Sequence, residues 1–184
     1  GINIVPTLWF DSFSLAELQL GFTHFNTSEI VLKPLVSANA DHTYRMTTEV
    51  LKEQADLLKT VFSEREFMLQ PFLNGIIEEG EYSLFYFAGQ YSHSILKQPG
   101  LGDFRVQEEH GGQLKSIQPC EEMLTTARHC LAALPADVLY ARIDLVRHKS
   151  EFAVIEIELI EPSLYFNMDA ESPQRFVDAF IEMC

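Results

Sequence analysis

Hydrophobic and polar residues alternate along two neighbouring segments late in the chain, and this alternation predicts two β-strands. Residues 152–164 read FAVIEIELIEPSL, which places Glu156 and Glu158 on one face of a strand among apolar residues. Residues 139–146 read LYARIDLV, and a polar turn at 147–150 joins the two segments. The segments therefore predict an antiparallel hairpin in which Asp144 lies across the ladder from Glu156 or Glu158.

Three carboxylates that converge from adjacent strands repel one another, and burial raises the cost of keeping them ionised. One or two hard divalent cations would neutralise them, and Mg²⁺ suits carboxylates that act together with substrate phosphates. Asp144, Glu156 and Glu158 are therefore the predicted Mg²⁺ ligands. The alternative is a surface strand whose acidic face is solvated by water.

The rest of the chain carries further strand and helix patterns. Apolar runs predict strands within 1–10 and at 29–35, 66–73, 81–88 and 91–96, and Trp9 is expected in a core. Helical spacing of apolar residues predicts a short helix at 12–18, one amphipathic helix through 43–62, and helices at 119–134 and from 172 onward. The glycine-rich segment 97–112 is too irregular for either element and is predicted to be a functional loop around Arg105.

The first half of the chain contains a predicted hinge between two lobes and a candidate phosphate-binding lysine. The strand at 66–73 stops at Pro71 and passes into a polar loop, which is typical of a hinge between lobes. Lys33 ends an apolar strand directly before Pro34 and a small polar loop. It is either a gatekeeper on an edge strand or a contact for a phosphate group.

The composition and charge of the chain exclude some classes of binding partner. The chain has 184 residues, 47% of them hydrophobic, and a net charge of −14, which argues against nucleic acid or an anionic membrane surface as a partner. No apolar run approaches the length of a membrane span and no signal peptide is recognisable, so we expect a cytoplasmic protein. The 3 cysteines fit neither a disulfide framework nor a zinc pattern.

Taken in order, four segments resemble the ATP-grasp superfamily, and within it the prokaryotic glutathione synthetase-like and RimK-like ligases, with the cycloserine-biosynthesis ligases as expected relatives. They read IVLKPLVSANA, FMLQPFL, GEYSLFYFAGQYSHSILKQPGLGDFRVQEEHGG and ARIDLV…VIEIELIEPS. The resemblance implies an α+β fold of two α/β lobes with mostly antiparallel sheets and a nucleotide cleft between them. It implies a smaller lobe at 1–73, with the lysine strand, flap, helix and hinge strand, and a larger lobe at 74–184 with the carboxylate hairpin.

The resemblance also implies roles for individual residues. Lys33 matches the lysine that holds the phosphates of ATP, and Glu81 matches the acidic residue that binds the ribose hydroxyls. Lys97 and Arg105 match basic positions near the phosphates and the acyl phosphate. The remaining implied residues are the adenine-binding hinge, Gln70, Pro71, Phe72 and Leu73; the magnesium ligands Asp144, Glu156 and Glu158; and the substrate side, Arg105, Gln107 and Ser163.

The implied reaction is an ATP- and Mg²⁺-dependent ligation of a carboxylate to an amine through an acyl phosphate, on a small amino-acid or peptide-like substrate. Phosphoryl transfer depends on positioning and charge neutralisation, so Lys33, Lys97, Arg105 and the cations would carry most of the catalysis. A kinase-like member that stops at phosphorylation and a nucleotide-binding regulatory module without turnover are the competing readings. A homodimer is among the expected states.

Three positions depart from the family pattern. The glycine-rich flap after the lysine reads Ser37-Ala38-Asn39-Ala40-Asp41-His42 here, Ser83 stands where many members have an arginine, and Glu158 replaces a usual asparagine. The family's N-terminal substrate domain and first nucleotide-binding lysine have no counterpart in the sequence. We therefore expect this chain to be the C-terminal part of a longer enzyme and to be inactive alone.

Overall fold

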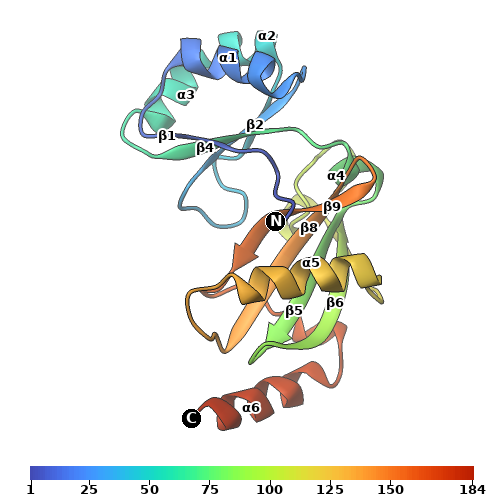
Figure 1. Ribbon diagram of the computed structural model, residues 1–184. Coiled ribbons are helices and arrows are strands. Elements are labelled where there is room, and N and C mark those ends of the chain that lie inside the picture. Colours follow the sequence, from blue (N-terminus) through green and yellow to red (C-terminus); the bar gives the residue numbers. More distant parts are fainter. The chain divides into compact units, whose positions relative to one another are not determined.

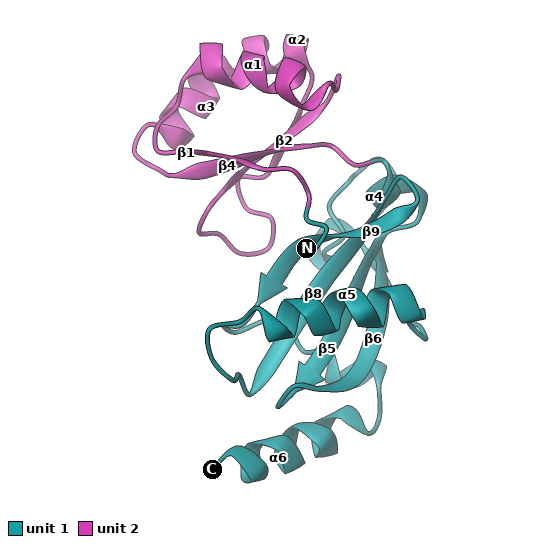
Figure 2. Ribbon diagram, in the orientation of Figure 1, with its two compact units in different colours: residues 1–4, 74–184 teal, residues 5–73 magenta.

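The computed structural model describes residues 1–184, and the chain divides into two compact units (Figure 2). Unit 2 comprises residues 5–73, and unit 1 comprises residues 1–4 together with 74–184. Residues 1–4 lie with unit 1 because Ile4 bridges Val154 in parallel and Asn3 O accepts the Val154 N–H at 2.9 Å. Each unit has its own hydrophobic core.

Unit 2 is a 4-stranded antiparallel sheet with helices packed on one face (Figure 1). Its strand order is β1-β4-β2-β3. The strands are β1 (Leu8–Phe10), β2 (Ile30–Pro34), β3 (Tyr44–Met46) and β4 (Phe67–Pro71), and the helices are α1 (Leu15–Phe25), α2 (Thr48–Glu53) and α3 (Ala55–Phe62).

Alternation along β2 decides which side chains of unit 2 face the helices. Ile30 and Leu32 are buried in the core, whereas Val31 and Lys33 are half-buried on the other face. Trp9, which was expected in the core, is 63% exposed because β1 directs its neighbours Leu8 and Phe10 toward the helices instead. Lys33 therefore belongs to the sheet face that the helices of unit 2 leave uncovered.

The prediction of a single helix through 43–62 is wrong, because this segment forms a strand and two helices. Tyr44–Met46 instead pairs with β2, and the Thr47 hydroxyl caps the following helix by accepting the Val50 N–H at 3.3 Å. Gln54, with φ −99° and ψ 9°, then separates α2 from α3. The helical spacing of the apolar residues was correct, but it could not reveal the strand partner or the break.

Unit 1 is a 5-stranded antiparallel sheet in the order β7-β6-β5-β8-β9. Figure 1 shows α5 lying across one face of this sheet. The strands are β5 (Glu81–Phe87), β6 (Gln90–Gln98), β7 (Gln113–Ser116), β8 (Tyr140–His148) and β9 (Glu151–Glu158). The helical elements are α4 (Gly75–Glu78), η1 (Glu108–His110), α5 (Glu121–Ala132), η2 (Phe166–Met168) and α6 (Ser172–Met183).

The strands predicted at 81–88 and 91–96 pair as one hairpin of unit 1, and the predicted hairpin that carries Asp144 and Glu156 is the other. In the first, Ala88 and Gly89 turn the chain with φ values of 43° and 74°, and Phe87 pairs with Gln90. In the second, Asp144 pairs with Glu156 and Arg142 with Glu158. The short elements β7 and α4 were not predicted. The mixture of antiparallel sheets and separate helices is the expected α+β fold. None of its helices combines the length and hydropathy that a membrane span requires.

The sheet face of unit 1 opposite α5 is covered in part by α6 and by the chain that follows β9. His93 stacks on Phe85 with ring centroids 4.3 Å apart, and its Nε2 lies 3.0 Å from the carbonyl oxygen of Leu164. Phe176 of α6 packs edge-on against Phe87 at 5.3 Å. These contacts fix the segment after β9 against the sheet.

Gly80 enters β5 in a conformation that other residues avoid, and we predict that Gly80→Ala is strongly destabilising. Its φ is +115°, and an added Cβ would lie 2.5 Å from the carbonyl oxygen of Lys97. We expect the free energy of unfolding to fall by roughly 2 to 4 kcal/mol in urea titrations. Gly89→Ala is the control, because its φ is +74° and its Cβ would meet nothing within 4 Å, so it should cost only about 1 kcal/mol. Equal losses in the two variants would contradict this account.

We also predict a pH-dependent contribution of His93 to stability. Burial lowers the pKa of His93, and the hydrogen bond to Leu164 only partly offsets this effect. The unfolded chain therefore binds more protons than the folded one near and below the ordinary histidine pKa of about 6.5, and stability is lost as pH falls through that value. Between about pH 8 and 5.5, the free energy of unfolding should fall less in His93→Gln than in the wild type. The exposed His129→Gln variant is the control and should follow the wild type.

Candidate functional site

Charged side chains gather on the sheet face of unit 1 that is opposite α5, which we call the polar face. The register of the strands explains why they meet: Glu81 pairs with Lys97, Ser83 with Asp144, and Asp144 with Glu156. The alternate residues of the same strands, among them Leu84, Ile143 and Leu145, form the core against α5. The period of two thus separates an apolar face from a charged one.

Asp144, Glu156 and Glu158, which we call the carboxylate cluster, come together as the sequence predicted. Each offers an oxygen that lies within 4.8 Å of the other two. Asp144 is fully buried, Glu158 is half-buried and Glu156 is exposed. Three carboxylate oxygens at this spacing are the ligand type that a hard divalent cation such as Mg²⁺ requires. The residues present therefore fit the implied metal.

Two buried cations balance part of this negative charge. Lys97 Nζ lies 2.7 Å from Glu81 Oε1 and 3.5 Å from Asp144 Oδ2. Arg142 contacts Asp144 Oδ2 at 2.9 Å and also pairs with Glu158. The polar face then has four carboxylates and two cations, so its ionised groups leave a net charge of −2, which one divalent cation would neutralise.

The pKa shifts follow from this packing. Burial alone would raise the pKa of Asp144, but Lys97, Arg142 and a hydrogen bond from Ser83 hold it below its ordinary value. Burial raises the pKa of Glu158, and the adjacent Arg142 only limits the rise. Burial would lower the pKa of Lys97, but Asp144 and Glu81 outweigh burial and raise it. Asp144 is thus ionised over the physiological pH range.

Sequence reasoning missed Arg142. The residue is 7% exposed, its Nε donates to both oxygens of Asp144 at 3.2 and 3.0 Å, and its Nη1 reaches the carbonyl oxygen of Ser163 at 3.5 Å. A signal was present, because Arg142 precedes Asp144 by two residues and so shares its strand face. This signal was overlooked because Arg142 is a single arginine in an otherwise mostly apolar strand.

The predicted loop residues Arg105 and Gln107 are held by their own loop. Arg105 forms a bidentate pair with Asp103, with Nη2 to Oδ2 at 2.7 Å, and this pairing holds the pKa of Asp103 well below its ordinary range. The side-chain oxygen of Gln107 is buried without a hydrogen-bond partner. An unsatisfied buried acceptor is unusual, and a change of loop conformation would allow it to bind a donor.

The residues expected to bind nucleotide in the first lobe lie in unit 2. Lys33 has no ion-pair partner within unit 2 and lies on the sheet face away from the helices. Gln70 donates from Nε2 to the Thr7 hydroxyl at 2.9 Å, and Phe72 lies beneath the Arg45 guanidinium at 3.7 Å. The residues predicted to form the hinge, Gln70, Pro71, Phe72 and Leu73, are all buried.

The flap at 37–42 keeps an unusual backbone without glycine. Asn39, Ala40 and His42 have φ values of 53°, 54° and 55°, in the left-handed region that favours glycine. Hydrogen bonds within the loop support this conformation, since Ser37 donates to the Asp41 carbonyl at 2.8 Å. The loop therefore adopts left-handed turns although it contains no glycine.

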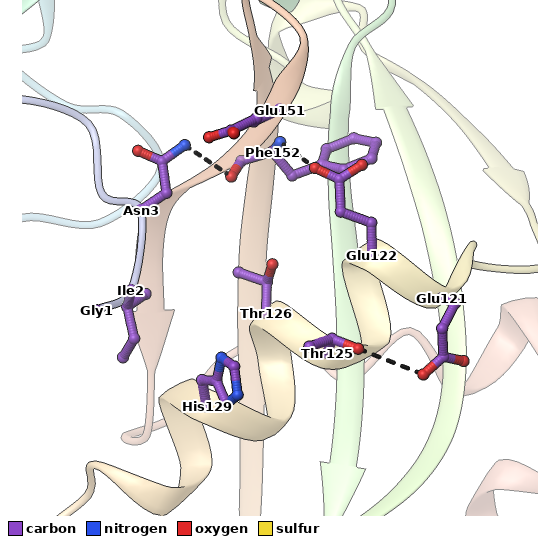
Figure 3. Close-up of a pocket in the computed structure, with 10 residues that line it drawn as sticks. All are labelled: Gly1, Ile2, Asn3, Glu121, Glu122, Thr125, Thr126, His129, Glu151 and Phe152. Carbon is purple, nitrogen blue, oxygen red and sulfur yellow. Dashed lines mark hydrogen bonds between the residues drawn. The ribbon is translucent and has the colours of Figure 1, made fainter.

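A separate hollow of about 350 Å³ lies on the α5 side of unit 1 (Figure 3). Its polar groups are largely bonded to one another: Glu122 accepts the Phe152 N–H at 3.0 Å, and Asn3 donates to the Phe152 carbonyl at 3.0 Å. None of the predicted site residues lines it. It is therefore not the candidate site.

Comparison with known proteins identifies a sequence relative and several structures with the same fold. No protein-family model matches the chain. The cycloserine biosynthesis protein DcsG of Streptomyces lavendulae is 32% identical over 125 residues, which are 62% of this chain and 41% of that protein. The crystal structure of D-cycloserine synthetase DcsG has a TM-score of 0.88 and 25% identity, and the match covers all of this chain and 66% of that one.

More distant structures share the fold. A D-alanine–D-alanine ligase from Bacillus anthracis matches with a TM-score of 0.71 and 17% identity, over 99% of this chain and 62% of that one. The ATP-grasp ligase PsnB, in a complex with a precursor variant, Mg and ADP, matches with a TM-score of 0.69 and 15% identity, over 97% of this chain and 54% of that one. The fold, the ordered segments and these similarities support the resemblance: the chain has the fold of the ATP-grasp ligases.

Proposed function

We propose that this chain is the nucleotide- and metal-binding part of an ATP- and Mg²⁺-dependent carboxylate–amine ligase. The observation that carries the proposal is the carboxylate cluster, whose excess negative charge lies beside two buried cations on one sheet face. Similarity to a cycloserine biosynthesis protein supports a small amino-acid-like substrate. The chain spans only 41% of that relative, so the substrate and the activity of the whole protein are part of the proposal.

The proposed reaction has two steps. An oxygen of the substrate carboxylate attacks the γ-phosphorus of ATP, and the bond between this phosphorus and the β,γ-bridging oxygen breaks. ADP departs, and the substrate is then an acyl phosphate. The substrate amine then attacks the acyl carbon, inorganic phosphate departs, and the nitrogen loses a proton to give an amide. Neither step needs a covalent bond to the protein.

Each charged residue has a proposed part in this chemistry. Asp144, Glu156 and Glu158 would hold Mg²⁺, which supplies charge neutralisation for the phosphoryl oxygens when bound. Arg142 lies between this cluster and the carbonyl oxygen of Ser163, so its guanidinium would orient an anionic group on the substrate side. Lys33 and Arg105 would contact phosphate oxygens, and Glu81 the ribose.

Lys97 could contact a phosphate of ATP directly only if its ammonium group left its present partners, Glu81 and Asp144. Its ammonium group lies between Glu81 and Asp144, so it contributes to the site by neutralising them unless ligands draw it away. Because three strands hold this ammonium group in a buried position, we assign Lys97 first to electrostatic balance and second to direct phosphate contact.

Nucleotide binding without turnover is the competing function. The pairing of Arg105 with Asp103 favours it, because a neutralised arginine contributes less to a transition state than a free one. ADP release in the presence of candidate amino acids would separate a ligase from such a module, and a phosphorylated product without an amide would indicate a kinase.

We predict that nucleotide binding by the protein in its full natural length depends on Mg²⁺ through the carboxylate cluster. Calorimetric titration with a non-hydrolysable ATP analogue should show tighter binding with Mg²⁺, and Asp144→Asn/Glu156→Gln should abolish that gain because it removes two ligand charges. Glu161→Gln and Glu171→Gln, which change exposed carboxylates outside the cluster, are the controls. Equal Mg²⁺ dependence in the site variant and the wild type would reject the metal site, and no nucleotide binding at all would reject the ligase.

A second prediction tests Lys33 as a phosphate contact. Lys33→Met should weaken binding of the ATP analogue by roughly 10- to 100-fold, the value of a hydrogen bond to a charged group. Binding of adenosine should not change, because the nucleoside has no phosphate. Lys59→Met, at the end of α3, serves as the charge-matched control. If affinity for adenosine and for the analogue fell together, Lys33 would be a structural residue only.

A further inference from the structure

Ser83 lies at the centre of the polar face. It stands in β5 directly opposite Asp144 of β8, and both residues are 0% exposed. The Ser83 hydroxyl donates to Asp144 Oδ1 at 2.5 Å, and the direction is fixed because an ionised carboxylate can only accept. The sequence suggested that Ser83 merely removes a cation found in relatives, but this contact gives it a partner inside the predicted metal site.

The two oxygens of Asp144 have different surroundings. Oδ1 receives the neutral Ser83 hydroxyl at 2.5 Å and a longer contact from Arg142 Nε at 3.2 Å. Oδ2 contacts cationic groups alone: Arg142 Nη2 at 2.9 Å, Arg142 Nε at 3.0 Å and Lys97 Nζ at 3.5 Å. One oxygen is thus anchored to the sheet by a group without charge, and the other faces the cationic side of the site.

A neutral donor has a specific advantage at this position. It satisfies one lone pair of a buried carboxylate without adding a positive charge, so it takes nothing more from the negative charge that Lys97 and Arg142 leave for a metal ion. A third cation here would compete with the metal for Asp144, and an apolar residue would leave Oδ1 with only the longer contact from Arg142 Nε. Hydrogen bonds of this kind orient the ligands of many metal sites.

We propose that Ser83 is a positioning residue that fixes the orientation of the Asp144 carboxylate between its cationic partners and the carboxylate cluster, and that it thereby sets the cation affinity of the cluster. This role rests on the proposed function only in taking the cluster as a cation site. It concerns affinity for the metal and predicts no change in contacts to the nucleotide base.

The test is Mn²⁺ binding measured by the loss of the electron paramagnetic resonance signal of free Mn²⁺, with Mn²⁺ alone and with a non-hydrolysable ATP analogue. Ser83→Ala should weaken Mn²⁺ binding by about 10- to 100-fold. Ser83→Thr, which keeps the hydroxyl, should restore most of the affinity, and Ser83→Cys, a weaker donor of similar size, should lie between. Thermal unfolding without metal shows which variants are folded.

Ser94→Ala is the matched control. Ser94 is also a buried serine of the same sheet, but its hydroxyl bonds to Tyr91 at 2.8 Å, on the α5 side. Unchanged Mn²⁺ affinity in both Ser83→Ala and Ser83→Cys, or equal losses in Ser83→Ala and Ser94→Ala, would overturn the role of Ser83. Asp144→Asn separates the two proposals: if the wild type binds Mn²⁺ and Asp144→Asn does not, the metal site stands whatever Ser83 does, whereas a wild type that binds no Mn²⁺ overturns both.

Discussion

The organisation of unit 1 depends on how the fully buried charge of Asp144 is compensated. A carboxylate with no exposed surface is costly unless cations and hydrogen-bond donors surround it. Lys97, Arg142 and Ser83 supply these partners from three strands, β6, β8 and β5. A slip of one residue in any pairing would turn these side chains to the α5 face, so charge compensation and strand register specify each other.

The same strands also build the hydrophobic core, and the stability that this core provides offsets the energetic cost of the charged face. Leu84, Ile143 and Leu145 pack with α5 on one side of the sheet. The apolar side contributes the free energy of folding, so the opposite side can hold groups selected for chemistry. On that side the excess of carboxylates is a source of repulsion that a bound divalent cation would remove, which links ligand binding to stability.

The sequence predicted the elements that local pattern specifies. The alternation in 152–158 placed Glu156 and Glu158 on one face, and the hairpin brought Asp144 beside Glu156, as the register shows. Prediction from the sequence failed where residues distant in the chain determine the secondary structure or the burial of a side chain. Tyr44–Met46 became a strand because β2 offers an edge, Trp9 was left exposed, and Arg142 gained its place only through Glu158 and the chain after β9.

By itself, the sequence determined the two-residue and helical periods, the family resemblance and the residue types able to hold a divalent cation. These are properties of neighbouring residues and of ordered motifs, so they can be read without a fold. Only the tertiary structure decided which charges neutralise one another: that Lys97 lies against Glu81 and Asp144, that Arg105 pairs with Asp103, and that Ser83 anchors Asp144. Electrostatic and hydrogen-bond energies depend on distance and burial, and strand pairing sets both for residues up to 61 positions apart.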